Sequence, residues 1–197
     1  MSYLNKKIII IDNSNLSYDG NDIDGTIVRG TEASLILLAE QFIKMGIEVD
    51  YCNSINDIKR VNGVNYFNKK NIYKNLIYDL AIAISDANEF YRVSSNKKAV
   101  FSNSNQPIEK FIRKKQLIPF IKFKPTLITL CDYQFKKRSF FTSFYGKKTI
   151  PITVDPKFLN VKIDINHLPE KKVVYNIRSN RNLDKLIKIW CEKIFPI

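Results

Sequence analysis

The chain has 197 residues, of which 45% are hydrophobic, and a formal net charge of +13. This length fits one full α/β domain but not two, and the hydrophobic content excludes a disordered chain. Apolar runs such as residues 8–11 are far shorter than a membrane span, and the start does not match a secretory signal. Three widely spaced cysteines, Cys52, Cys131 and Cys191, favour reduced thiols in a cytoplasmic protein over disulfides or a zinc site.

The positive charge is concentrated in one part of the sequence. Residues 1–91 contain 9 basic and 12 acidic side chains, whereas residues 92–148 contain 14 basic and 2 acidic ones. Such a concentrated field attracts anionic partners: phosphates, nucleic acid or acidic lipid headgroups. A generally lysine-rich composition is the alternative explanation, although it does not account for the separation of lysines from acids.

The first elements in chain order form a βαβ unit. Residues 7–12 contain four consecutive isoleucines and predict a buried strand. A polar stretch, residues 13–29, is followed by apolar residues at helical spacing, with Thr31 as the predicted cap and Gly46 as the stop. Residues 47–52 predict a second strand, parallel to the first.

Strands and helices continue to alternate as far as residue 154. Residues 53–74 are the least regular and predict an irregular excursion with one short strand. The pattern as a whole predicts a Rossmann-like three-layer α/β domain with a mostly parallel sheet over residues 1–159. The further predicted elements are strands at 79–85, 98–102, 126–130 and 149–154, and helices at 106–121 and 132–144.

The last part of the sequence predicts the start of a second domain. Residues 160–171 are polar and suit a linker. Residues 172–177 then predict a strand, and residues 182–194 a helix with one apolar face. Because a single βα unit cannot bury its own apolar side, residues 172–197 are expected to be an incomplete second domain, or one that a partner chain completes.

Two common nucleotide motifs are absent. A dinucleotide site requires a glycine-rich turn directly after the first strand and an acid at the end of the second. Asp50 fits the second requirement, but residues 12–15 contain no glycine. No P-loop is present either. We therefore expect neither a dinucleotide cofactor nor P-loop phosphoryl transfer.

The loop before the first helix is a candidate phosphate site. Gly25, Arg29 and Gly30 lie there, and backbone N–H groups at a helix N-terminus bind anions, which an arginine would reinforce. The alternative is an ordinary β–α loop whose glycines relieve strain.

Polar residues at two later strand ends are candidates for an acceptor site. Asn103, Ser104 and Asn105 follow one strand, and Asp86 follows another. Ligands bind at the carboxyl ends of strands in open α/β sheets. Asp86 also fits a helix cap.

Three segments resemble GT-B glycosyltransferases of the family 4 type. Residues 25–49 contain a glycine loop, an amphipathic helix and the run KMGIEV, in which Ile47 replaces the histidine of the family. Residues 144–158 are similar to the family's "yg..k..vipnGvD...F" stretch, with Thr153 in place of its glycine. Residues 173–187 resemble "vvy.gR...KGld.Li", which opens the second domain. The three segments occur in the order of the family.

The resemblance implies a hexosyltransferase with a nucleotide-sugar donor, a glycan, lipid-linked or envelope acceptor, and no metal or other cofactor. The family's acidic donor site lies later in the second domain, so the catalytic residues stay unknown and little turnover is expected of this chain alone. Basic and aromatic residues suit attachment of a cytoplasmic enzyme to the inner membrane face. The donor diphosphate contacts implied are Gly25, Arg29, Gly30, Arg178 and Arg181.

Two alternatives stay open. The basic segment, residues 92–148, fits a nucleic-acid-binding module, although no RNA-recognition or helix-turn-helix signature is present. The unpartnered βα unit at residues 172–197 fits a non-catalytic or split subunit that needs a partner half-domain.

Overall fold

The computed structural model of the protein describes residues 5–25, 28, 30–72, 75–102, 108–136, 145–151 and 183–194. The chain consists of two compact units, Met1–Leu159 and Asn160–Ile197. None of the described helices is long and apolar enough to cross a membrane.

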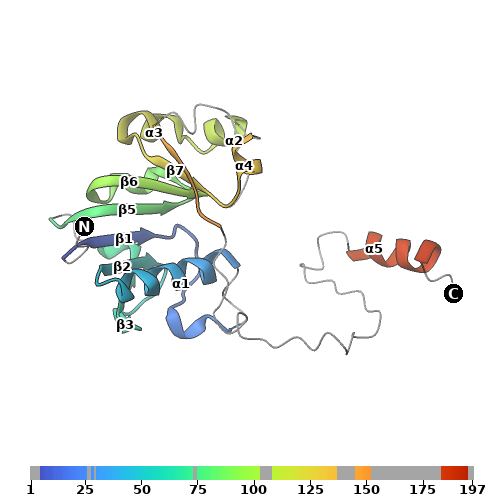
Figure 1. Ribbon diagram of the computed structural model, residues 1–197, viewed down its shortest axis with the longest axis horizontal. Helices are drawn as coiled ribbons and strands as arrows, with labels where there is room; N and C mark the ends of the chain where they lie inside the picture. The colour runs from blue at the N-terminus through green and yellow to red at the C-terminus, as the bar shows by residue number, and fades with distance from the viewer. Residues whose placement is uncertain are drawn as a thin grey trace. The chain divides into compact units, whose positions relative to one another are not determined.

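An eight-stranded sheet forms the centre of the first unit, in the order β3-β4-β2-β1-β5-β6-β7-β8. Every neighbouring pair is parallel except β3 and β4. Helices flank this sheet, so the predicted Rossmann-like three-layer α/β domain is confirmed (Figure 1). The strands are β1 (Lys7–Ile11), β2 (Glu48–Asn53), β3 (Lys59–Val61), β4 (Val64–Asn68), β5 (Ile77–Ile84), β6 (Ser94–Ser102), β7 (Thr126–Thr129) and β8 (Lys147–Thr149).

The core consists of two apolar clusters, one on each face of the sheet. Alternate isoleucines of β1 belong to different clusters, because successive side chains of a strand point to opposite faces. This strand is therefore buried on both sides, as its unbroken apolar run predicts. Helix α1 (Gly30–Lys44) packs on the first cluster through Leu35, Ile36 and Ala39. The second cluster includes residues from η3 (Ala87–Tyr91), α2 (Ile108–Arg113) and α3 (Leu117–Phe123).

Strand β2 runs from Glu48 to Asn53, so Asp50 lies in its interior and is not the acid that ends the strand. The Asp50 side chain is buried. Its carboxylate accepts hydrogen bonds from Asn65 Nδ2 at 2.9 Å and from the Tyr78 hydroxyl at 2.7 Å. The Lys7 ammonium lies 3.3 Å away. This acid therefore connects β2 with β4, β1 and β5.

Residues 53–74 contain a regular hairpin where an irregular excursion was predicted. Strands β3 and β4 pair antiparallel, and Asn62 and Gly63 connect them with φ values of 49° and 85°. Positive φ at both loop residues defines the type I′ turn, for which Asn-Gly is the preferred pair. The described residues also form η1 (Gly20–Asp22), η2 (Lys69–Asn71) and α4 (Asp132–Lys136).

The single helix predicted at 106–121 is wrong, because the chain forms two short helices there. Lys115 adopts a left-handed conformation with φ 53°. Its N–H donates to Ile112 O, and the N–H of Gln116 donates to Phe111 O, which is the bonding pattern of a Schellman stop. The buried Gln116 side chain then donates from Nε2 to Ser85 O at 3.0 Å. This tertiary contact separates α2 from α3.

The final predicted strand of the first unit is also shifted. Residues 149–154 were expected to form it, whereas β8 occupies Lys147–Thr149 beside β7. Ile150 leaves the strand, its N–H donating to Thr129 O at 2.8 Å. The predicted helix 132–144 is described only as α4, and its residues beyond Lys136 lie outside the described part of the chain.

In the second unit, the described residues form one helix. It begins as α5 (Leu183–Ile189) and continues as a π-helical segment, Trp190–Ile194. Lys188 and Glu192 form an exposed i,i+4 pair. The predicted linker 160–171 and strand 172–177 lie outside the described residues.

Candidate functional site

A crevice lies where β1 and β5 end, at the reversal of the strand order. These strands are neighbours in the sheet. The connection after β1 leads to α1 on one face, and the connection after β5 leads to η3 on the other. Because the two connections diverge, a crevice remains between them, which is the usual ligand site of doubly wound sheets.

The crevice contains a cavity of about 300 Å³. We call it the switch-point cavity. Its lining consists of residues from the ends of β1 and β5, the first turn of α1 and the residue after α2: Asp12, Asn13, Ser14, Thr31, Glu32, Ile84, Ser85, Asp86 and Lys114.

Asp12 is held rigidly at the end of β1. Its N–H donates to Cys52 O at 2.8 Å, which continues the ladder to β2. The carboxylate accepts from the Ser14 N–H at 2.8 Å, the Ser14 hydroxyl at 2.7 Å and the Tyr18 hydroxyl at 2.6 Å. The side chain is therefore oriented before any ligand arrives.

Two buried tyrosines, Tyr18 and Tyr51, form a hydrogen-bonded chain that ends at Asp12. The hydroxyl oxygens of Tyr18 and Tyr51 are 2.7 Å apart. Burial is the largest cause that raises the pKa of Tyr18 far above its usual value, and the neighbouring Tyr51 and Asp12 raise it further. Burial likewise raises the pKa of Tyr51. Tyr18 therefore stays protonated and donates to Asp12, while Tyr51 donates to Tyr18.

Glu32 is an incompletely satisfied acid of the cavity. It lies in the first turn of α1, where the helix dipole favours a carboxylate. The residue is only 8% exposed, and Oε2 has no hydrogen-bond partner in the described part of the chain. Buried polar atoms are normally paired, so this oxygen has an acceptor position available to a ligand.

Asp86 caps η3 and also lines the cavity. Its Oδ1 accepts from the N–H of Asn88 at 2.9 Å, and Oδ2 accepts from Asn13 Nδ2 at 3.4 Å. Within η3, burial raises the pKa of Glu89. The charge of Arg92 lowers this pKa, whereas the charges of Asp86 and Asp12 raise it further. Several carboxylates thus lie near one another at this edge of the sheet.

Acids outnumber bases in the switch-point cavity. Its lining includes Asp12, Glu32 and Asp86 against one lysine, Lys114. The nearby Lys69 ammonium donates to two carbonyl oxygens of the Asn13–Ser14 turn, at 3.2 and 3.0 Å. A diphosphate would be repelled by this lining, whereas hydroxyl groups would find several acceptors. In the described residues no cluster of three or more His, Cys, Asp or Glu suits a metal ion.

Of the predicted site residues, three are described. Asp86 lines the switch-point cavity. Gly25 lies in a turn in which its N–H donates to Asp22 O at 2.8 Å. Gly30 is the first residue of α1, and a Cβ there would meet no atom within 4 Å. The predicted residues that lie outside the described part of the chain are Arg29, Asn103, Ser104, Asn105, Arg178 and Arg181.

Among the residues that line the switch-point cavity, sequence reasoning assigned only Asp86 to a site. The polar residues that it missed include Asp12, Ser14, Glu32 and Lys114. Asp12 had a usable signal, since it is the first polar residue after the buried strand. The position of Glu32 fits an ordinary acid in the first turn of a helix, so the local sequence does not mark it as a site residue. Lys114 could not be assigned, because its position depends on the helix break that follows it.

No protein-family model matches the sequence, and no curated protein matches it significantly. The resemblance to glycosyltransferases therefore depends on the three sequence segments alone.

Proposed function

We propose that the protein is the acceptor-side part of a glycosyltransferase, and that the switch-point cavity binds hydroxyl groups of a glycan acceptor. The observation that carries the proposal is the buried Glu32 Oε2, which lacks a hydrogen-bond partner within the described residues. The position of the cavity at the reversal of the strand order also supports it, as does the order of the three resembling segments.

The chemistry of the lining favours hydroxyl groups over anions. A sugar hydroxyl is neutral and donates one hydrogen bond, which a carboxylate accepts strongly. Asp12 and Asp86 already accept hydrogen bonds from the protein, whereas Glu32 Oε2 accepts none within the described residues. Three acids within one small cavity would hold several hydroxyl groups of one ligand.

In the proposed reaction, an acceptor oxygen attacks the anomeric carbon of the donor sugar. The bond from this carbon to the donor diphosphate breaks, and the hydroxyl proton passes to the departing diphosphate oxygen. We assign Glu32 the role of hydrogen-bond acceptor for the incoming hydroxyl. The donor contacts, Gly25, Arg29, Gly30, Arg178 and Arg181, are proposed from the sequence resemblance.

Binding of neutral sugars to the full chain tests the proposal. Saturation-transfer NMR with a panel of neutral oligosaccharides and nucleotide sugars should identify at least one neutral glycan that binds. Glu32→Gln should lower its affinity about 10-fold to 100-fold, because one charge-assisted hydrogen bond is weakened.

The matched control is Glu40→Gln on the same helix. Glu40 accepts from Asn62 Nδ2 and does not line the cavity, so this change should leave sugar affinity unaltered. Absence of any sugar binding, or binding that survives Glu32→Gln, would contradict the proposal.

A further inference from the structure

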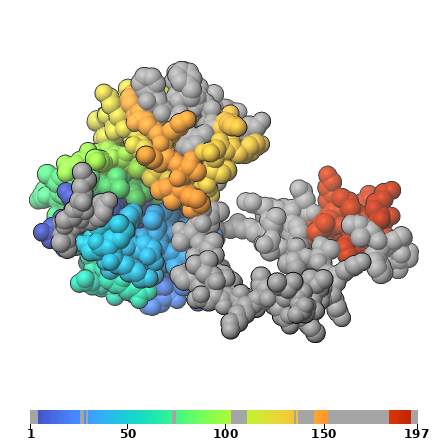
Figure 2. All heavy atoms as spheres, viewed as in Figure 1, coloured from blue at the N-terminus to red at the C-terminus, as the bar shows by residue number. Residues whose placement is uncertain are grey.

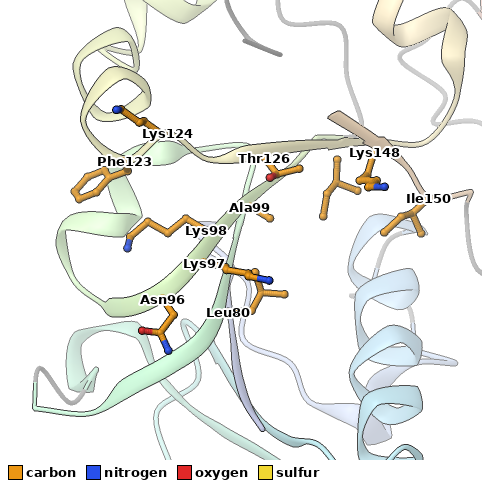
Figure 3. Close-up of a pocket in the computed structure, with 11 residues that line it drawn as sticks. Leu80, Asn96, Lys97, Lys98, Ala99, Phe123, Lys124, Thr126, Lys148 and Ile150 are labelled. Atoms are coloured by element: carbon orange, nitrogen blue, oxygen red, sulfur yellow. The ribbon is translucent and has the colours of Figure 1, made fainter. Parts of the chain in front are cut away.

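A second cavity, of about 560 Å³, lies over the β5–β8 half of the sheet (Figure 3). We call it the lysine-rimmed cavity. It is separate from the switch-point cavity and shares no lining residue with it. Its lining is Leu80, Asn96, Lys97, Lys98, Ala99, Phe123, Lys124, Thr126, Ile128, Lys148 and Ile150.

The strand register explains why distant residues meet here. Leu80 pairs with Lys97, Ala99 with Thr126, and Ile128 with Lys148. Paired residues and those two positions along a strand share one face of a sheet. Four strands therefore contribute side chains to the same surface.

Helix α1 covers another part of this same face of the sheet. Ala99 and Ile128 belong to the apolar cluster that includes Leu35 of α1. Ile150 packs against the same cluster, and Figure 3 shows it beside the helix. In Figure 2, orange atoms that include β8 meet the light-blue surface of α1. Among the cavity-lining residues, Phe123 is the one that belongs to a helix.

The floor of the lysine-rimmed cavity is apolar. It consists of Leu80, Ala99, Ile128 and Ile150. The volume of the cavity is in the range of small-molecule sites. An apolar floor of this size in an open cavity favours a ligand with a hydrocarbon part.

The polar part of the lining is positively charged. This lining contains no acid and four lysines, which are Lys97, Lys98, Lys124 and Lys148. Neither Lys97 nor Lys148 forms an ion pair with another residue in the described part of the chain.

Lys98 is the most enclosed of these lysines. Its ammonium donates to Ser95 O at 2.8 Å and lies 5.6 Å from the centre of the Phe123 ring. Burial lowers the pKa of Lys98. Lys98 alternates with Lys97 along β6 and lies over Phe123, which packs on the second cluster. The lysines that share the face of the apolar floor are therefore Lys97 and Lys148.

We propose that the lysine-rimmed cavity binds an anionic amphiphile, with a single hydrocarbon chain on the apolar floor and a phosphate or carboxylate headgroup at the lysines. The charge of the rim selects the headgroup, and the apolar floor selects the chain. The inference goes beyond the proposed function and does not depend on it, because the two cavities have different linings.

Titration calorimetry of the full chain with dodecyl phosphate, below its micelle concentration, tests this directly. Three probes are matched to it: inorganic phosphate has the headgroup alone, hexyl phosphate has a shorter chain, and dodecyl maltoside has a neutral headgroup. Dodecyl phosphate should bind about tenfold or more tightly than each of them, because only this ligand uses both the floor and the rim.

Charge-removing variants locate the headgroup. Lys97→Gln with Lys148→Gln should weaken dodecyl phosphate at least about tenfold. Lys44→Gln with Lys136→Gln removes the same charge at exposed lysines outside the cavity and should change affinity less than twofold. Glu32→Gln should have no effect, which separates this result from that of the proposed function.

Several results would overturn the proposal. If dodecyl maltoside bound as tightly as dodecyl phosphate, the lysine rim would not select a charged headgroup. If inorganic phosphate bound as tightly as dodecyl phosphate, the apolar floor would not contribute to binding. Equal loss in both double variants would point to non-specific attraction. Complete displacement of dodecyl phosphate by polyglutamate would indicate an acidic protein partner instead. The series of probes on the unaltered chain stays decisive even if the double variant fails to fold.

A vesicle experiment distinguishes the source of the amphiphile. Vesicles of phosphatidylcholine with phosphatidic acid are compared with pure phosphatidylcholine vesicles. Sedimentation with the anionic vesicles that is lost in Lys97→Gln with Lys148→Gln assigns the headgroup to a bilayer lipid. Dodecyl phosphate binding without sedimentation assigns it to a soluble amphiphile.

Discussion

Around Asp12, single hydrogen bonds orient a side chain that lines the switch-point cavity. The Tyr18 hydroxyl links Asp12 to Tyr51, and both tyrosines are fully buried. The Tyr66 ring lies 5.3 Å from that of Tyr51, and its hydroxyl has no hydrogen-bond partner among the described residues. The Asp12–Tyr18 bond therefore connects this aromatic cluster to the ligand-facing acid.

Tyr18→Phe should lower the free energy of unfolding by about 1–3 kcal/mol, because it removes two buried hydrogen bonds and leaves the Tyr51 hydroxyl unpaired. Urea unfolding followed by circular dichroism measures the change. Tyr91→Phe is the control: Tyr91 is half exposed and packs its ring on Phe123, so the change there should stay within about 0.5 kcal/mol. Equal effects of the two substitutions would refute the role given to Tyr18.

At the scale of elements, the β3–β4 hairpin and the α2–α3 break depend on left-handed residues. Gly63 is the clearest case, because its φ is 85° and a Cβ added there would lie only 2.7 Å from Ile43 Cγ2 of α1. The hairpin turn thus packs closely against the helix that carries Glu32. A glycine is required here both by the turn and by the close approach.

Gly63→Ala should destabilise the protein by about 1–3 kcal/mol, because it adds a strained φ and a steric clash. Gly30→Ala is the matched substitution, since an added Cβ there meets nothing within 4 Å and alanine favours a helix more than glycine does. It should be neutral or stabilising by up to about 1 kcal/mol. Thermal unfolding of both variants compares them, and a neutral Gly63→Ala would contradict the turn assignment.

At the scale of the whole molecule, the basic residues are concentrated in segment 92–148 of the sequence, and their positions in the structure decide which partners they suit. Lys97 and Lys148 lie on the α1-facing side of the sheet, whereas Lys114 lines the switch-point cavity. Some basic residues of segment 92–148 therefore line two different cavities. A nucleic-acid-binding module would instead present its cations as one stripe along the backbone of its ligand.

Nucleic-acid binding should accordingly be weak and non-specific. Fluorescence anisotropy with labelled single-stranded and duplex oligonucleotides should give dissociation constants of about 10⁻⁶–10⁻⁴ M at physiological salt, with a steep loss as salt increases. Dissociation constants of about 10⁻⁸ M or below at physiological salt, the range of specific complexes, would favour the nucleic-acid alternative over the glycosyltransferase proposal.

Much of the fold could be predicted because local patterns and global packing agree. The isoleucines of β1 and the spacing of Leu35, Leu38 and Phe42 in α1 each have one consistent interpretation. The hairpin was missed although Asn62 and Gly63 are a strong local signal. The break before α3 was missed because no glycine marks it. Lys115 takes the left-handed position, and the contact of Gln116 is with Ser85, 31 residues away in the sequence.

The sequence by itself determined the class of the protein: an α/β domain with a parallel sheet, a buried first strand and an excess of positive charge in residues 92–148. These properties follow from composition and from short-range periodicity, which act within a single element. Only the tertiary structure decided which side chains meet. Asp12, Glu32 and Asp86 come from three separate segments, and Leu80, Ala99, Ile128 and Ile150 from four strands or their ends. Strand order and register place them together, and neither is a property of any local stretch of sequence.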